Sequence, residues 1–264
     1  MARQSPATDG MTMALRRPSL QFPVTDASPD TPLPILLLEP DFAVVAKPAG
    51  LMAHASPMAR GERDFLDERL RVQFGRPVHL VHRLDRATSG CQLIAFDAGC
   101  AARLGAQFMS RDVAKDYLAV CRGWPDDQRI DHPLDGGPGK PEKKPAITDL
   151  VVLARAELAQ PDARHESSRY ALVRCSPQTG RYRQIRRHLK HLSHHLVGDS
   201  SHGDGRHNRA FRMAGVHRML LHAERLAFAH PDDGQPLRVA APLDAEFARA
   251  LAFLGIAWPL ESGS

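Results

Sequence analysis

The chain has 264 residues, of which 43% are hydrophobic, enough to bury a sizeable core in one large domain or two small ones. Its formal net charge of +5 suggests a polyanionic partner. No apolar run is long enough to span a bilayer and no export signal is indicated, which favours a cytoplasmic location. The four scattered cysteines include no CxxC pair, so we expect reduced thiols and neither a zinc ribbon nor a disulfide framework.

The first predicted segment is a disordered tail over residues 1–30, which are rich in Ser, Thr, Pro, Asp and Ala. One domain is expected over 31–260. Its first half is predicted to contain a strand, turn and strand within 35–54, a helix at 64–74, a strand, turn and strand at 81–97, a helix from an Asp97 cap to Met109, and a strand at 114–123.

Residues 132–146, "HPLDGGPGKPEKKPA", open the second half as a polar loop, either a spacer or a flexible nucleic-acid contact. The pattern then predicts strands near 147–154 and 169–176, a tight turn and helix within 179–199, a strand near 220–228, and a helix near 243–254. Because strands cluster with few helices between them, the chain is predicted to be α+β. We expect a mixed, largely antiparallel central sheet flanked by helices and loops.

One candidate for chemistry is Asp85, which lies in the predicted turn of "VHRLDRATSGCQLIAFD" between Arg83 and Arg86. In an arbitrary sequence a loop salt bridge is the more common explanation of such a carboxylate. Exposed ion pairs contribute little to stability, however, which directs attention to a functional role.

A second candidate is the basic segment "TGRYRQIRRHLKHLSHHLVGD" at 179–199. On a helix over 183–194, one face is predicted to be apolar and the opposite face basic. The apolar residues are Ile185, Leu189 and Leu192; the basic ones are Arg183, Arg187, Lys190 and His194. Between Arg181 and Arg218 there are eight Arg and one Lys against two Asp, a density typical of phosphate-backbone binding.

Arg186 falls at the edge between the two faces, where a partly dehydrated guanidinium needs a counter-ion. We expect Asp85 to supply it. His191 and His195 have the i, i+4 spacing of a metal pair, but no carboxylate or cysteine completes a set and "HExxH" is absent. We therefore predict no metal site and expect the histidines to contact RNA.

Three segments in order resemble one known family, the RNA pseudouridine synthases of the RluA type. They are "HRLDRATSG" (82–90), "KDYLAV" (115–120) and "TGRYRQIRRHLKHLSHHLVGD" (179–199), the last resembling "GRTHQIRxHL…GHPIxGD". "DFAVVAKPAG" and "LLHAERLAFAHP" (220–231) also fit, so the resemblance spans roughly 35–231. "GDSSHGDGRHNRAF" (198–211) resembles the branch that modifies a uridine in the tRNA acceptor stem and lacks an S4-type RNA-binding domain.

The resemblance implies a single catalytic domain without an S4 domain, no cofactor, and no obligate protein partner. It implies catalytic roles for Asp85, for Arg186 as its partner, and for Tyr117, which would stack on the base. The candidates for RNA contact are Arg83, Arg181, Arg183, Arg187 and Lys190. The sequence departs from the family where Tyr182–Arg183 replaces a Thr-His pair and His194–His195 replaces His-Pro, which affects substrate contacts more than chemistry.

The predicted reaction converts uridine to pseudouridine, its isomer, so no electron acceptor or group donor is required. Asp85 can begin it as a nucleophile on the sugar or as a base that removes a sugar proton, and the sequence leaves both open. The favoured substrate is tRNA. The alternatives are ribosomal RNA, an RNA-binding module without catalysis, and a hydrolase, which would ordinarily need a second carboxylate.

Overall fold

The computed structural model describes residues 31–55, 64–159 and 166–259. The tail predicted for residues 1–30 lies outside these ranges. The strands in the described part are β1 (Ile35–Leu38), β2 (Phe42–Lys47), β3 (His79–Leu80), β4 (Ser89–Ala95), β5 (Ala114–Arg122), β6 (Gln128–Asp131), β7 (Leu134–Asp135), β8 (Lys143–Lys144), β9 (Ile147–Leu158), β10 (Ser168–Pro177), β11 (Leu221–Ala229) and β12 (Pro236–Ala240). The helices are α1 (Leu66–Phe74), α2 (Ala98–Ser110), α3 (Gln184–His191), α4 (Gly205–Met213) and α5 (Ala245–Phe253).

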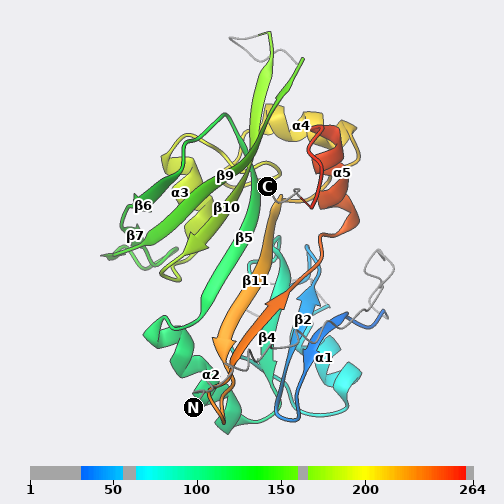
Figure 1. The fold of residues 1–264 in the computed structure, drawn as a ribbon, viewed down its shortest axis with the longest axis vertical. Coiled ribbons are helices and arrows are strands. Elements are labelled where there is room, and N and C mark those ends of the chain that lie inside the picture. Colours follow the sequence, from blue (N-terminus) through cyan, green and yellow to red (C-terminus); the bar gives the residue numbers. More distant parts are fainter. Residues whose placement is uncertain (1–30, 56–63, 160–165, 260–264) are drawn as a thin grey trace, which may run out of the picture.

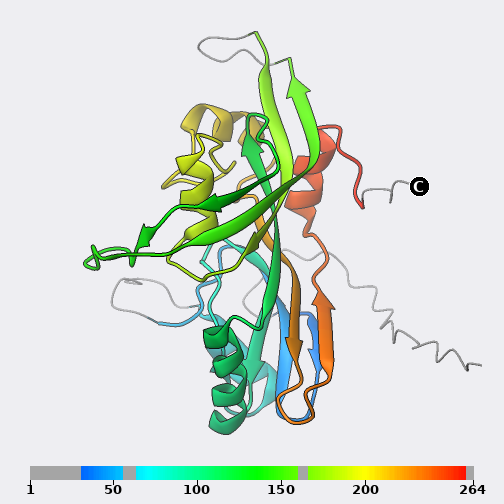
Figure 2. The same ribbon diagram turned by 60° about the vertical axis from the view of Figure 1, so that its left-hand side comes forward.

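A ten-stranded sheet runs through the described part of the molecule in the order β1-β2-β4-β11-β5-β10-β9-β6, with β12 on β11 and β3 on β4 (Figure 1). The β4–β11 pair is parallel, and every other pairing in this sheet is antiparallel. The predicted α+β class, with a mixed and largely antiparallel sheet, is confirmed. In two views, α1 and α2 lie in the lower half of the molecule and α3, α4 and α5 in the upper half (Figures 1 and 2).

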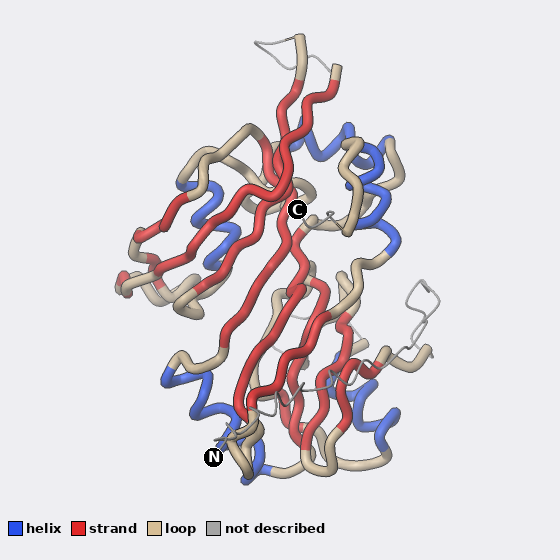
Figure 3. The backbone as a smooth tube through the Cα atoms, in the orientation of Figure 1, coloured by secondary structure: helices blue, strands red, loops and turns tan. Residues whose placement is uncertain are grey.

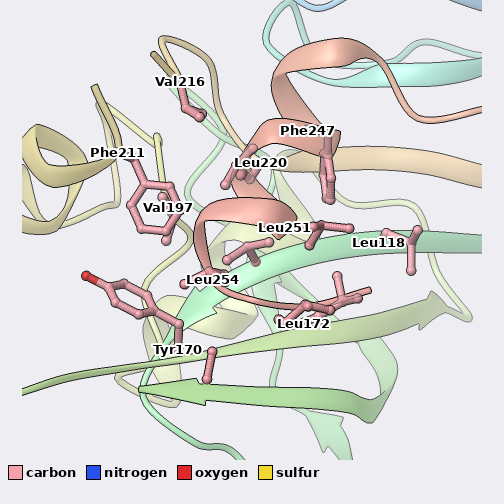
Figure 4. Packing of buried hydrophobic residues seen from close by; sticks show 14 residues of the cluster. Leu118, Tyr170, Leu172, Val197, Phe211, Val216, Leu220, Phe247, Leu251 and Leu254 are labelled. Carbon is pink, nitrogen blue, oxygen red and sulfur yellow. The ribbon is translucent and has the colours of Figure 1, made fainter. Parts of the chain in front are cut away.

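The helices are held by apolar clusters that share the sheet. Figure 4 shows one, which contains Phe247 and Leu251 of α5 together with Leu118 and Leu172 of the sheet. Phe211 of α4 joins the same cluster and packs against the ring of Tyr170. A second cluster joins α2 to the sheet, a third joins α3 to it, and a fourth joins α1 to it. Helix α2 begins where predicted, because the Asp97 carboxylate accepts a hydrogen bond from the amide of Cys100 at 2.9 Å.

The predicted strand before Asp85 is wrong in position. β3 covers His79–Leu80, and residues 81–88 form an irregular segment. Side chains replace ladder hydrogen bonds there: the His82 Nε2 accepts from the amide of Leu93 at 3.0 Å, and Gln92 Nε2 donates to the carbonyl of His82 at 2.7 Å. Burial lowers the pKa of His82 to about 3, so the ring is neutral and able to accept.

The second half differs from the prediction in three places. The loop 132–146 contains a small two-stranded unit, β7 paired with β8. Strands β6 and β12 and helix α4 were not predicted; β6 and β12 are short, β6 is the edge strand beside β9, and β12 pairs with β11 outside the main strand order. Helix α3 ends at His191, with Leu192 as its C-cap, so His194 is not on the helix. The strand and loop path is seen most clearly in Figure 3.

Candidate active site

Asp85 is brought to the centre of the sheet by the parallel β4–β11 pair. Gly90 of β4 lies opposite Ala223, and Ala223 lies opposite Tyr117 of β5, so these three positions share one row. A Cβ on Gly90 would lie 2.2 Å from the Ala223 carbonyl oxygen, and its φ of 112° also disfavours other residues. The glycine therefore permits the close strand approach that places the Asp85 turn next to Tyr117.

Lys47 holds the Asp85 turn through hydrogen bonds to its backbone. It lies opposite Gly90 in the sheet, is 1% exposed, and directs its Nζ at backbone carbonyl oxygens. These belong to Pro48 (2.9 Å), Asp85 (3.4 Å), Arg86 (3.1 Å) and Thr88 (2.9 Å). Burial, with Arg218 acting in the same direction, lowers the pKa of Lys47 to about 7, whereas the four carbonyl oxygens favour its charged form. The sequence analysis missed this residue, although a lysine inside the apolar strand "FAVVAK" is a signal.

We expect Lys47→Met to reduce kcat and to lower the free energy of unfolding by about 1–3 kcal/mol, because buried carbonyl groups lose their donor. The measurements are single-turnover kinetics and urea unfolding. Lys140→Met, at an exposed lysine, is the matched control. Wild-type kcat and stability in Lys47→Met would contradict a supporting role.

The expected ion pair between Asp85 and Arg186 is present. Arg186 Nη1 donates to Asp85 Oδ2 at 2.8 Å, and the side chains are 7% and 30% exposed respectively. Arg186 also makes a bidentate pair with Asp199, with Nε–Oδ2 at 2.7 Å and Nη2–Oδ1 at 2.8 Å. One guanidinium is thus fixed by a fully buried carboxylate and offers its remaining edge to Asp85, which stays partly open to solvent.

Asp199 was not among the predicted site residues, although the Gly-Asp pair of the family pattern falls on Gly198–Asp199. Its carboxylate also accepts from the amides of Ser201 (2.8 Å) and His202 (3.0 Å). Burial acts to raise the pKa of Asp199, but the hydrogen bonds and charge of Arg186 outweigh it and the pKa lies below its usual value. A Cβ on Gly198 would lie 2.0 Å from the Arg218 carbonyl oxygen, so this turn requires glycine.

Tyr117 points to the α3 side of the sheet and is part of the cluster that includes Ile185 and Leu189. Burial raises the pKa of its hydroxyl well above the usual value, and the charge of Asp85 acts in the same direction. The hydroxyl is therefore protonated at neutral pH. Tyr117 lies on β5, and Asp85 lies in the irregular segment that leads into β4.

We expect Tyr117→Ala to lower kcat/KM roughly 5- to 150-fold, since stacking of a base on an aromatic ring contributes about 1–3 kcal/mol. Tyr117→Phe keeps the ring and should retain most binding, so any loss in kcat reports on the hydroxyl. Thermal unfolding of both variants controls for packing. Equal losses in the two variants would contradict a stacking role for the ring.

The basic side of α3 differs from the prediction. Arg187 is half-buried and paired with Asp135 (2.7 Å), so it anchors the 132–146 loop and does not face solvent freely. His194 Nδ1 lies 2.9 Å from the carbonyl oxygen of Arg122. Lys190 is exposed, as predicted. His194 differs from the prediction because α3 ends at His191, and Arg187 differs because the 132–146 loop packs against the outer side of α3.

The other candidates for RNA contact lie at the surface or at its margin. Arg83 is exposed, with Nη1 3.5 Å from His54 Nε2. Arg181 is half-buried and donates to the carbonyl oxygen of Pro145 at 3.0 Å. Arg183 has a φ of 51° at the N-cap of α3, and its guanidinium carbon lies 4.9 Å from the Tyr182 ring centroid.

The histidines that suggested a metal pair and the four cysteines have other surroundings in the structure. Within the described ranges, no group of three or more His, Cys, Asp or Glu residues is arranged to hold a metal ion. His195, whose spacing from His191 suggested a pair, instead has its Nδ1 2.6 Å from the carbonyl oxygen of His202. The four cysteines are free and buried, and burial raises their pKa, for Cys91 and Cys121 to about 12.

In the part of the chain described, no helix has the length and apolar character needed to cross a bilayer.

Comparison with known proteins gives the same class. Residues 41–191, which include Lys47, Asp85, Tyr117 and Arg186, match the family model described as RNA pseudouridylate synthase. The chain belongs to this family and is a pseudouridine synthase, a type of isomerase.

The chain is similar to three bacterial proteins named tRNA pseudouridine synthase C. It is 41% identical to that of Salmonella typhimurium (84% of this chain, 90% of the relative), 41% identical to that of Pasteurella multocida (81% and 93%), and 37% identical to that of Vibrio cholerae (84% and 96%). Among solved structures, human RNA pseudouridylate synthase domain containing 1 matches with a TM-score of 0.65 at 29% identity (85% of this chain, 90% of that one). The human domain containing 4 also has a TM-score of 0.65, at 23% identity over 86% and 95% of the two chains, and supports the fold alone.

Proposed function

We propose that this protein isomerises a specific uridine of tRNA to pseudouridine, in the acceptor stem. The observation that carries the chemistry is the partly exposed Asp85 carboxylate, held at 2.8 Å by Arg186 and near enough to Tyr117 for its charge to raise the pKa of the Tyr117 hydroxyl. The substrate rests on two likenesses: relatives about 40% identical are named for tRNA, and residues 198–211 resemble the acceptor-stem branch.

The chemistry needs an ionised carboxylate, a base that has left its stack, and a site that holds the detached base. In this isomerisation the glycosidic C–N bond breaks, the uracil rotates, and a C–C bond forms between the same sugar carbon and a ring carbon. That ring carbon loses its proton and the freed ring nitrogen gains one, so atoms and electrons balance without a co-reactant. The guanidinium of Arg186 donates to the Asp85 carboxylate at 2.8 Å and is its counter-ion. Asp85 then acts either on the sugar carbon as a nucleophile or on a sugar proton as a base.

The target nucleotide must be extruded, because the reacting atoms are inaccessible inside a helix. The ring of Tyr117 offers a face for the detached base, and its protonated hydroxyl can donate a proton near the ring. Arg83 is exposed two residues before Asp85, which supports a role in contacting a phosphate or in filling the gap left in the stack.

The test is incubation of the wild-type protein with unmodified tRNA and ribosomal RNA transcripts, followed by carbodiimide mapping. Pseudouridine at one acceptor-stem position of tRNA is expected. Product in ribosomal RNA alone would overturn the tRNA assignment, and release of free uracil would indicate a hydrolase. Binding of RNA without product in either substrate would leave an RNA-binding module and refute the proposal.

A further inference from the structure

Helix α4 carries three arginines on its outward side. Arg206, Arg209 and Arg212 recur at every third position and are all exposed, whereas His207, Asn208 and Phe211 are buried. At 3.6 residues per turn, the three arginines lie on the half of the helix opposite the buried one. Gly205–Met213 contains no acidic residue. The three arginines are called the α4 stripe below.

The α4 stripe makes no side-chain interaction that would hold the fold together among the residues that the structure describes. No hydrogen bond or ion pair joins any of its three guanidinium groups to that part of the chain, in contrast to Arg187 on α3. The carboxylate nearest in sequence is Asp204, and it is already engaged. Asp204 caps α4 by accepting from the amide of Arg206 at 3.0 Å, and it pairs with Arg122 at 3.1 Å. Three like charges on one short helix face are unfavourable unless a polyanion binds there.

The α4 stripe is fixed in position relative to the catalytic carboxylate. Asn208, on the buried side of α4, donates to the Asp199 carbonyl oxygen at 3.1 Å and accepts from the amide of Gly198 at 2.7 Å. The Asp199 carboxylate in turn holds Arg186, which holds Asp85. Phe211 packs in the apolar cluster of α5 (Figure 4), so the helix is anchored on both sides of its buried face.

We propose that the α4 stripe binds the phosphate backbone of a helical part of the RNA substrate and sets the distance from that helix to the uridine at Asp85. The proposal rests on the proposed function in taking RNA as the substrate. Six residues of helix rise about 9 Å, and one strand of a B-form duplex advances about 3.4 Å per phosphate along its axis, so the stripe matches the length of roughly three phosphates on that scale. Such contacts fix register without reading sequence.

The test uses the single variant Arg209→Gln and the triple variant Arg206→Gln, Arg209→Gln and Arg212→Gln. The matched control is Arg238→Gln. Arg238 is also exposed but lies on β12, in the lower half of Figure 1. Filter binding of a tRNA transcript is measured over a salt series. Each lost phosphate contact should reduce the steepness of log K against log salt by about 0.7–0.9, and the triple change by about 2–3, while the control leaves it unchanged. KM should rise in the triple variant with kcat preserved at saturating RNA.

An unchanged salt slope in the triple variant would overturn the proposal, and so would a loss confined to kcat. Urea unfolding confirms that each variant is folded, and the single variant decides the matter if the triple one is not. Binding is measured independently of product. If the wild type makes no pseudouridine in tRNA but the slope still falls in the triple variant, the proposed function fails and the α4 stripe remains an RNA-binding surface.

Discussion

Asp85→Asn is expected to abolish isomerisation while RNA binding stays close to that of the wild type. The amide has nearly the same shape as the carboxylate, and its oxygen can still accept the hydrogen bond from Arg186. It carries no negative charge, however, and can neither attack the sugar nor remove a proton. The expected fall in kcat is at least about 10²- to 10⁴-fold, the usual contribution of such a group.

The readouts for this variant are single-turnover carbodiimide mapping and filter binding. Asp131→Asn, at an exposed aspartate of β6, is the matched control and should retain full activity. Substantial turnover by Asp85→Asn would remove Asp85 from the catalytic role. Loss of RNA binding in parallel with activity would assign it to substrate recognition.

Arg186→Met is expected to abolish activity and to lower the free energy of unfolding by about 3–5 kcal/mol, as breaking a buried pair from one side does. The side chain of Asp199 is fully buried and would lose its bidentate partner, keeping the amide donors of Ser201 and His202. Urea unfolding at neutral pH gives the stability. The double variant Arg186→Met with Asp199→Leu should regain much of the stability and none of the activity, which separates the two roles.

The ion pair between Arg186 and Asp199 also predicts how the free energy of unfolding depends on pH. The pKa of Asp199 is below its usual value in the folded state, so the pair contributes stability above the unfolded pKa of about 3.9 and loses it as pH falls through the folded pKa. In Arg186→Met the buried Asp199 carboxylate loses its charged partner, and burial then acts to raise its pKa, opposed only by the amides of Ser201 and His202. The variant lacks the stability that the charged pair supplies at neutral pH, so its loss of stability on acidification should be smaller than that of the wild type. Unfolding series between about pH 3 and 7 measure both limits. Coincident acid limbs in the two proteins would contradict the assignment.

The part of the site predictable from sequence is the part that local pattern determines. Asp85 lies in a motif turn, and the helix wheel places Arg186 at the border of an apolar face, where a charge requires a partner. The structure confirms their contact at 2.8 Å. The strand that carries Tyr117 and the cap at Asp97 are also local features, and both lie where they were expected.

The part that the sequence did not predict depends on segments that are distant along the chain. Arg187 appeared to face solvent because nothing near it in sequence shows that Asp135 returns to pair with it. Lys47 donates to backbone carbonyl oxygens about 40 positions away. A pattern of side chains gives no information on where backbone carbonyl groups lie, so this contact could not be predicted. Asp199 is 13 residues from Arg186, beyond the helix, where a wheel no longer applies.

The separation between catalytic partners has a consequence for folding. Asp85 and Arg186 are 101 positions apart, and the parallel β4–β11 pairing, which includes the Gly90–Ala223 row containing Tyr117, joins residues 133 positions apart. Closing such long loops costs chain entropy before any contact compensates for it, so non-local pairings of this kind form slowly. The hairpins β1–β2 and β9–β10 can form early, but a chain that has only these has no assembled catalytic site. Recovery of activity on refolding should therefore lag behind recovery of secondary structure.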